Sequence, residues 1–351
     1  MENQNQTPHK RRVRYKGKYP KKFEEKYKEL QPEKYKDTIE HVIQKGNTPA
    51  GMHISIMVKE IIDFLNIQPG EIGFDATLGY GGHTKAMLKC LNGKGHIYAT
   101  DVDPEESDKT KKRLADQGFG EDLLTVKLQN FCTIDEIAKE VGGFDLILAD
   151  LGVSSMQIDN PKRGFSFKVD GPLDLRLNQE AGISAAERLD TITRDELAGM
   201  LYENSDEPYC EELAKAITDE IRKGNRIDTT AKLRQVIEKT LDFLPEKEKK
   251  DTIKKTCQRT FQALRIDVNR EFEVLYEFME KLPDALRPGG RAAILTFHSG
   301  EDKLVKKALK EGYKAGIYSD YAKDVIRPSA QECAQNGRAR STKMRWAVKN
   351  K

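Results

Sequence analysis

The segment FDATLGYGGHT, residues 74–84, joins the end of an apolar strand to the start of a helix through a turn rich in glycine. Asp75 stands at the predicted strand end, and Gly79, Gly81 and Gly82 lie in the turn. Glycine lets a backbone approach a ligand closely, and the first N–H groups of a helix have no partner within it. A strand, a glycine turn and a helix in this order predict a ligand-binding loop at the edge of a sheet.

Strands and helices alternate along the sequence on both sides of this turn. Apolar residues recur at helical spacing over 53–67. The predicted strands are 72–76, 96–100, 124–128 and 144–149, and the predicted helices between them are 84–90, 105–117 and 134–140. Strands that alternate with helices need right-handed crossovers, so we expect an α/β fold with a parallel, doubly wound, Rossmann-like sheet.

The alternation stops after Asp150. Residues 183–255 carry only helical patterns, with a capping box from Thr193 to Glu196. A single long helix is predicted over 257–282, and the strand predicted over 291–297 returns the chain to the sheet. We therefore expect a sheet domain built from 49–157 and 256–351, interrupted at 158–255 by a substrate loop and an inserted all-helical domain.

The charge of the chain is concentrated at its beginning. The formal net charge of the 351 residues is +3, but residues 1–48 hold 13 Lys and Arg against 7 Asp and Glu. The densest part, HKRRVRYKGKYPKK (residues 9–22), mixes eight cations with Tyr15 and Tyr19. This basic leader, 1–48, is predicted to be disordered when free. Two interpretations of it stay open, a nucleic-acid-binding segment or a solubilising tail.

Composition excludes several classes of protein. Charged residues make up 33% of the chain, and no apolar run approaches the roughly 20 residues of a membrane span. The N-terminus lacks the apolar stretch of a secretory signal, so we expect a cytoplasmic protein. The five cysteines lie at least 42 positions apart, without metal-ligand spacing, and are predicted to be reduced thiols.

The second predicted strand ends at Asp101, twenty positions after Gly81. A carboxylate there can accept hydrogen bonds from both hydroxyls of a ribose. The dinucleotide fingerprint requires a third glycine where this chain has Thr84, which disfavours NAD. The loop that starts at Asp75 instead resembles that of class I methyltransferases. Their cofactor, S-adenosylmethionine, has no pyrophosphate but carries an ammonium group that an acid can bind directly or through water.

Several longer strings resemble one family. They are ILADLGVSSMQIDNPKRGFSF (147–167), GPLDLRLN (171–178), RTFQALRIDVN (259–269), RPGGRAAILTFHSGED (287–302) and RARSTKMRWAV (338–348). In this order they closely resemble the bacterial 16S rRNA cytosine-N4 methyltransferases of the MraW/RsmH type, from about Gly51 to Lys349. Gly300 stands where that family usually has leucine, and Met156 where it usually has proline.

The resemblance implies an enzyme that methylates the exocyclic N4 amine of a cytosine in 16S rRNA of the small ribosomal subunit. S-adenosylmethionine is the implied cofactor, and neither a metal nor a membrane is expected to be required. Alternatives left open are a methyltransferase for another RNA or a small molecule, and a non-catalytic RNA-binding module. A module without catalysis has no need for the glycine turn together with Asp101.

The resemblance also implies a cofactor site. With the residues already identified, the predicted cofactor contacts are Asp75, Gly79, Gly81, Gly82, His83, Asp101, Phe131, Asp150 and Gln157. Phe131 is alternatively an ordinary core residue, and His83 alternatively caps the helix after the turn. Asp150 follows the fourth strand, in the crevice where doubly wound sheets bind ligands.

The amine of cytosine is a poor nucleophile because its lone pair is delocalised into the ring. Acceptors for its protons favour a pyramidal nitrogen and stabilise the developing positive charge. The predicted catalytic residues are Asp150, Ser154 and His298, of which Asp150 is the best acceptor. Ser154 and His298 are alternatively structural. The predicted substrate contacts, alternatively parts of a packed lid, are Arg163, Phe165, Arg176, Arg265 and Asn269.

Overall fold

The computed structural model describes residues 55–351, and the basic leader predicted over 1–48 lies outside the described residues. Seven strands form one sheet in the order β3-β2-β1-β4-β5-β7-β6. Their bounds are β1 (Ile72–Asp75), β2 (His96–Asp101), β3 (Leu124–Leu128), β4 (Phe144–Asp150), β5 (Leu286–Thr296), β6 (Tyr318–Tyr321) and β7 (Lys343–Lys349). Neighbours from β3 to β5 pair in parallel, and β7 lies antiparallel between β5 and β6. The predicted doubly wound sheet is confirmed.

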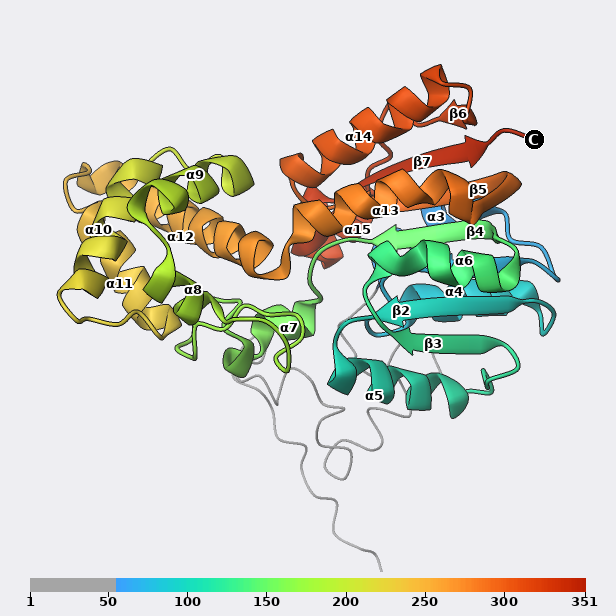
Figure 1. Ribbon diagram of the computed structural model, residues 1–351, viewed down its shortest axis with the longest axis horizontal. Coiled ribbons are helices and arrows are strands. Elements are labelled where there is room, and N and C mark those ends of the chain that lie inside the picture. The colour runs from blue at the N-terminus through green and yellow to red at the C-terminus, as the bar shows by residue number, and fades with distance from the viewer. Residues whose placement is uncertain (1–54) are drawn as a thin grey trace, which may run out of the picture. The chain divides into compact units, whose positions relative to one another are not determined.

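Helices cover both faces of the sheet (Figure 1). The helices of the sheet region are α3 (Val58–Leu65), α4 (Gly82–Leu91), α5 (Pro104–Ala115), α6 (Ile134–Val141), α13 (Glu271–Ala285), α14 (Ser299–Lys314) and α15 (Ala330–Gln335). One apolar core lies among β1, β4, β5, α6, α13 and α14. Another lies among α3, α4, α5, the strands β2, β3 and β7, and the opposite face of β4 and β5. Because both faces are covered, the central strands are almost continuously apolar, as parallel strands usually are.

A third apolar core belongs to the helices between β4 and β5. After α7 (Ser155–Asp159) and a loop come α8 (Ala185–Thr191), α9 (Arg194–Ser205), α10 (Cys210–Arg222), α11 (Thr230–Thr240) and α12 (Glu246–Asn269). The predicted capping box at Thr193 is present at the start of α9. Figure 1 shows α8–α11 grouped beside α12, which leads from them to α13.

The prediction of one long helix over 257–282 is wrong. Arg270 has a left-handed backbone (φ 51°) that ends α12 and precedes α13. No proline or glycine marks this break. The side chain of Asn269 instead bonds to the loop before α8, so a tertiary contact holds the chain in the turn.

No helix among residues 55–351 combines the length and the apolar character that a bilayer crossing requires.

Candidate active site

Three acidic residues lie at the carboxyl ends of adjacent strands. β2, β1 and β4 are neighbours in the sheet and end at Asp101, Asp75 and Asp150. Because parallel strands present their carboxyl ends at one edge, the three side chains share the crevice where such sheets bind ligands. The glycine turn after β1 lies at the same edge, joined to Asp101 by a hydrogen bond from the backbone N–H of Gly79.

Asp75 organises the turn rather than facing solvent. Its side chain is fully buried, and each carboxylate oxygen has a donor: the backbone N–H of Thr77 at 3.0 Å and the hydroxyl of Thr84 at 2.6 Å. Burial raises the pKa of Asp75, and the bond from Thr84 opposes this rise. The carboxylate therefore fixes the start of α4, and any contact with a cofactor ammonium has to use the remaining lone pairs.

Asp101 has a similar set of donors at the end of β2. The backbone N–H groups of Gly79 and Asp103 donate to its two oxygens at 2.8 and 2.9 Å. Burial raises its pKa to about 6, while these backbone bonds act in the opposite direction. Each carboxylate oxygen can accept a second hydrogen bond, so Asp101 is held in place and still has acceptor capacity for a ribose.

The three glycines of the turn have different reasons for being glycine. A Cβ on Gly81 would lie 2.8 Å from Thr110, and one on Gly82 would lie 2.0 Å from the hydroxyl of Ser55. Protein atoms therefore require both. Gly79 has φ 46°, and a Cβ there would meet no atom of residues 55–351 closer than 3.9 Å. It is the glycine whose open side leaves room for a ligand.

Asp150 and His83 form a pair beside the turn. His83 is 7% exposed; its Nε2–H donates to the carbonyl of Ile56 at 2.9 Å, and its Nδ1 lies 3.4 Å from Asp150 Oδ2. Since a carbonyl only accepts, Nε2 carries a proton, and the facing Nδ1 and Oδ2 share at most one more. The other oxygen, Oδ1, is buried with no hydrogen-bond partner among the described residues. Burial raises the pKa of Asp150 to about 6, His83 lowers it, and Asp75 and Glu301 raise it further.

His298 belongs to a charged cluster at the start of α14. Its Nε2 lies 3.2 Å from Glu301 Oε1, and Glu301 is 3% exposed. Glu271, His298 and Glu301 offer ligand atoms within 4.8 Å of one another, which is a possible metal site. However, Arg265 donates to both oxygens of Glu271 at 2.7 and 2.8 Å. This guanidinium already compensates one carboxylate, so the cluster needs no cation to be stable.

The predicted residues after β4 are engaged locally. Ser154 is the N-cap of α7, and Gln157 completes a capping box: its Oε1 accepts from the backbone N–H of Ser154 and its Nε2 donates to Asp103. Phe131, after β3, packs edge-on against Phe278 of α13 at 5.2 Å. These positions border the edge with Asp101 and Asp150, but each side chain also has a structural partner.

The predicted substrate residues are bonded to the protein itself. Arg176 donates to both oxygens of Asp174, and Asn269 binds the backbone of Leu175 and Leu177. Phe165, 9% exposed, belongs to the apolar core of the helical insert. Arg163 is 6% exposed and pairs with Asp103 at 2.8 Å. Together they shape the loop over 160–178 and attach it to α12 and to the end of β2.

Sequence reasoning missed Asp103 and Glu301. Asp103 is 1% exposed and caps α5, where Pro104 occupies the first helical position. An aspartate followed by proline at a predicted helix start is a recognisable N-cap signal. Glu301 accepts from the backbone N–H of Phe297 at 2.8 Å. A glutamate three residues after the start of a predicted helix is typical of a capping box, and this pattern could have identified it.

Phe272 occupies the space beside Gly300. A Cβ on Gly300 would lie 2.5 Å from the Phe272 ring. Both residues line a cavity of about 350 Å³ between α9 and α14, together with Lys303 and Lys307. The aromatic ring of α13 therefore fills room that a larger residue at position 300 would need.

Comparison with known proteins identifies the family of this chain. The sequence profile of the MraW methylase family matches residues 50–350. A protein of Agathobacter rectalis named ribosomal RNA small subunit methyltransferase H 1 is 88% identical over 341 residues, 97% of this chain and 98% of that protein, so most of the leader is shared with it. A protein of the same name from Lachnoclostridium phytofermentans is 69% identical, over 99% of this chain and 95% of that protein.

Among solved structures, the fold is similar to a SAM-dependent O-methyltransferase of Thermotoga maritima, with a TM-score of 0.40 and 11% identity over 89% of this chain and 71% of that one. The doubly wound sheet with an antiparallel β7 is the class I methyltransferase fold. With a profile match over nearly all described residues, the chain belongs to the MraW methylase family.

Proposed function

We propose that this protein transfers the methyl group of S-adenosylmethionine to the exocyclic N4 amine of a cytosine in 16S rRNA of the small ribosomal subunit. The names of its relatives support a small-subunit rRNA substrate. The observation that carries the reaction is Asp150 Oδ1, a buried carboxylate oxygen with no hydrogen-bond partner among residues 55–351, at the edge that also holds the glycine turn. A cytoplasmic location follows from this substrate.

The residues at the ends of β1 and β2 would hold the cofactor. Asp101 would accept hydrogen bonds from the ribose hydroxyls, and the open side of Gly79 would allow the backbone to approach the ligand. Asp75 holds the turn in shape through Thr77 and Thr84. When bound there, S-adenosylmethionine supplies an electrophilic methyl group on its sulfonium.

Asp150 activates the amine. Its Oδ1 accepts a hydrogen bond from N4–H, which favours a localised lone pair and stabilises positive charge as the N–C bond forms. With a pKa of about 6, Asp150 is mostly ionised at neutral pH and still basic enough to hold the proton that N4 loses. When its Nδ1, 3.4 Å from Oδ2, also carries a proton, His83 stabilises the ionised carboxylate.

The loop over 160–178 supports the RNA as a shaped surface. Its arginines at 163 and 176 form ion pairs with Asp103 and Asp174, so we expect cations outside this loop to contact the RNA phosphates. The internal bonds instead fix the path of the backbone beside the crevice. A fixed wall of this kind holds an unstacked base with little loss of conformational entropy on binding.

The test is methyl transfer by the full-length protein. Small subunits from a strain without the enzyme are incubated with labelled S-adenosylmethionine, and the digested 16S rRNA is analysed by mass spectrometry. We expect N4-methylcytidine at one position, and none with Asp150→Ala. Label on a ring carbon, on another RNA or on no RNA would contradict the proposal.

A further inference from the structure

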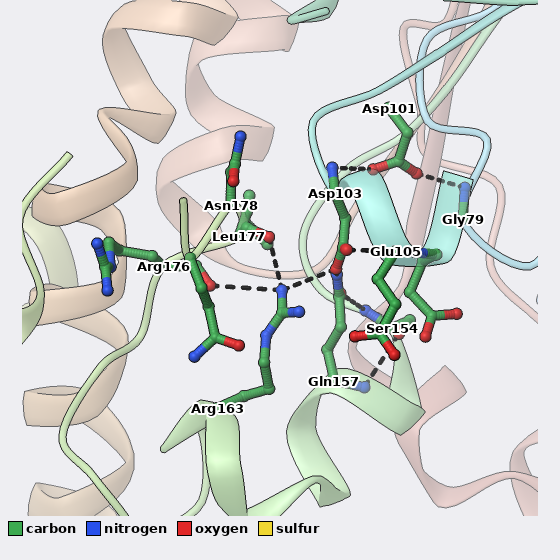
Figure 2. Close-up of polar contacts among 12 residues, drawn as sticks. Gly79, Asp101, Asp103, Glu105, Ser154, Gln157, Arg163, Arg176, Leu177 and Asn178 are labelled. Atoms are coloured by element: carbon green, nitrogen blue, oxygen red, sulfur yellow. Dashed lines mark hydrogen bonds and ion pairs between the residues drawn. The ribbon is translucent and has the colours of Figure 1, made fainter. Parts of the chain in front are cut away.

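A buried ion pair joins the cofactor edge to the substrate loop. The Arg163 guanidinium, at the end of the short helix η3 (Pro161–Arg163), lies 2.8 Å from Asp103 Oδ2, and the two side chains are 7% and 2% exposed. Figure 2 shows Arg163 between the segment that contains Asp101 and Asp103 on one side and Leu177 on the other. The pair connects residues 60 positions apart in the sequence.

On the cofactor side, Asp103 is hydrogen-bonded to Asp101. The backbone N–H of Asp103 donates to Asp101 Oδ1 at 2.9 Å, and Asp103 Oδ1 accepts from the first turn of α5. The orientation of the Asp103 side chain is therefore set by the same short segment that presents Asp101 to a ribose.

On the loop side, Arg163 holds the backbone of the substrate loop. Its guanidinium donates to the carbonyl of Leu177 at 2.6 Å. The carbonyl of Arg163 accepts from the N–H of Leu175 at 3.0 Å, and the N–H of Leu177 donates to Asn269 of α12. Leu175 has φ 64°, a left-handed conformation that a leucine adopts only where surrounding contacts impose it.

The chemistry of the ion pair makes the position of the loop depend on Asp103. A buried guanidinium that loses its carboxylate is left uncompensated, so the loop is stable in this position only while Asp103 is correctly placed. Both contacts use one terminal nitrogen of Arg163, Nη2, which donates to the Asp103 carboxylate and to the Leu177 carbonyl. The lysine side chain is one bond shorter, so its ammonium cannot occupy this position.

We propose that the Arg163–Asp103 pair couples the two substrates: a ribose bound at Asp101 orders the segment through Asp103, which holds the loop over 160–178 in the position that accepts RNA. By linkage, RNA on the loop raises cofactor affinity by the same factor. Arg163 is thus a positioning residue and not a phosphate ligand. The inference rests on the proposed function for the identity of the two ligands.

The first test needs only the cofactor. Hydrogen exchange of the Leu175 and Leu177 amides is measured in the full chain with and without S-adenosylmethionine. We expect the cofactor to slow exchange in the wild type and to have no effect on these amides in Arg163→Met. Arg345→Met is the matched control, because it breaks a similarly buried pair with Asp302 at 2.6 Å that has no link to Asp101. It should respond as the wild type does.

The second test measures the coupling factor. Affinity for S-adenosylhomocysteine is determined with and without saturating small subunits. About tenfold tighter binding with subunits is expected for the wild type and Arg345→Met, and less than twofold for Arg163→Met. A wild-type factor in Arg163→Met overturns the proposal. Equal loss of RNA affinity with and without cofactor overturns it also, because that result identifies a phosphate ligand.

A second substitution guards against misfolding. Arg163→Lys keeps the charge near Asp103, but its side chain is one bond too short to place the ammonium between Asp103 and the Leu177 carbonyl. It should therefore fold and show an intermediate factor. A full wild-type factor in Arg163→Lys would contradict the role of the bond to Leu177. Failure of the proposed function has a different signature: wild-type protein binds the cofactor and protects the loop but methylates no rRNA.

Discussion

The carboxylates at the ends of β1 and β2 differ from the carboxylate at the end of β4, in the same crevice, in the hydrogen bonds that they accept. At β1 and β2, all four oxygens of Asp75 and Asp101 accept hydrogen bonds from backbone or threonine donors. At β4, Asp150 has His83 beside one oxygen, and the other oxygen has no hydrogen-bond partner in the part of the chain that the structure describes. A buried acceptor without a partner is unfavourable. The difference therefore indicates that the ends of β1 and β2 form a rigid binding site, whereas the end of β4 keeps an acceptor available for the reacting atom.

The same contrast appears in the electrostatics. Burial raises the pKa of both Asp101 and Asp150 to about 6. At Asp101, backbone N–H groups oppose this rise and the carboxylate of Asp103 adds to it. At Asp150, no backbone donor of the described residues opposes the rise; His83 opposes it, and the carboxylates of Asp75 and Glu301 add to it. Asp101 is therefore suited to hold a neutral ribose, and Asp150 to exchange hydrogen bonds and protons with an amine.

Asp150→Ala should have the largest effect on activity. In the proposed reaction its Oδ1 bonds to the amine most strongly as positive charge develops, so we expect single-turnover methyl transfer at saturating S-adenosylmethionine to fall at least about 100-fold. Affinity for small subunits should change less than about threefold, because it depends on many other contacts.

Asp150→Asn separates acceptance from charge. It keeps one acceptor oxygen without the negative charge, and it should retain more activity than the alanine variant. If Asp150→Ala methylates at the wild-type rate, the two edges do not differ in function and another group accepts the amine proton.

Asp101→Ala should act on binding instead of turnover. It removes charge-assisted hydrogen bonds to the ribose worth about 1.5 to 3 kcal/mol, so calorimetry should show cofactor affinity about 10- to 100-fold weaker. The rate at saturating cofactor should stay within about threefold. A folded variant with unchanged affinity would remove Asp101 from the cofactor site.

Lowering the pH should affect the two edges separately. A carboxyl with a pKa raised to about 6 gains its proton as the pH falls through 6, well above the usual range of aspartate. At pH 5 about one tenth of Asp150 is ionised, so kcat at saturating cofactor should fall about tenfold from its plateau, while protonation of Asp101 should raise KM for the cofactor.

Two variants test which carboxyl causes the change in kcat and which causes the change in KM. Asp150→Asn should show a kcat that is flat between pH 5 and 7, and Asp101→Asn should show a KM that is flat over the same range. A wild-type kcat that stays constant down to pH 5 would contradict a raised pKa at Asp150.

The strand ends could be read from the sequence, but the side-chain pairs between distant segments could not. The predicted strand 124–128 matches β3, and β1, β2 and β4 differ from prediction by one residue at one end. Since parallel strands end at one edge, Asp75, Asp101 and Asp150 are brought together by topology alone. The break at Arg270 and the pair of Arg163 with Asp103 depend on loop contacts that have no periodic signal.

Ser154→Ala should have the smallest effect and distinguishes two roles that the sequence leaves open. In the structure, the Ser154 hydroxyl accepts from the backbone N–H of Gln157 at 3.2 Å and so caps α7. Loss of an N-cap costs about 1 kcal/mol, so the midpoint of thermal unfolding should fall by a few degrees. The rate at saturating cofactor and small subunits should change less than about threefold. Ser154→Asn provides the control, because asparagine is an equally good N-cap and should restore stability. If the alanine variant instead loses tenfold in rate at unchanged stability, Ser154 orients the base. Asp150 and Ser154 would then both act on the substrate at the end of β4.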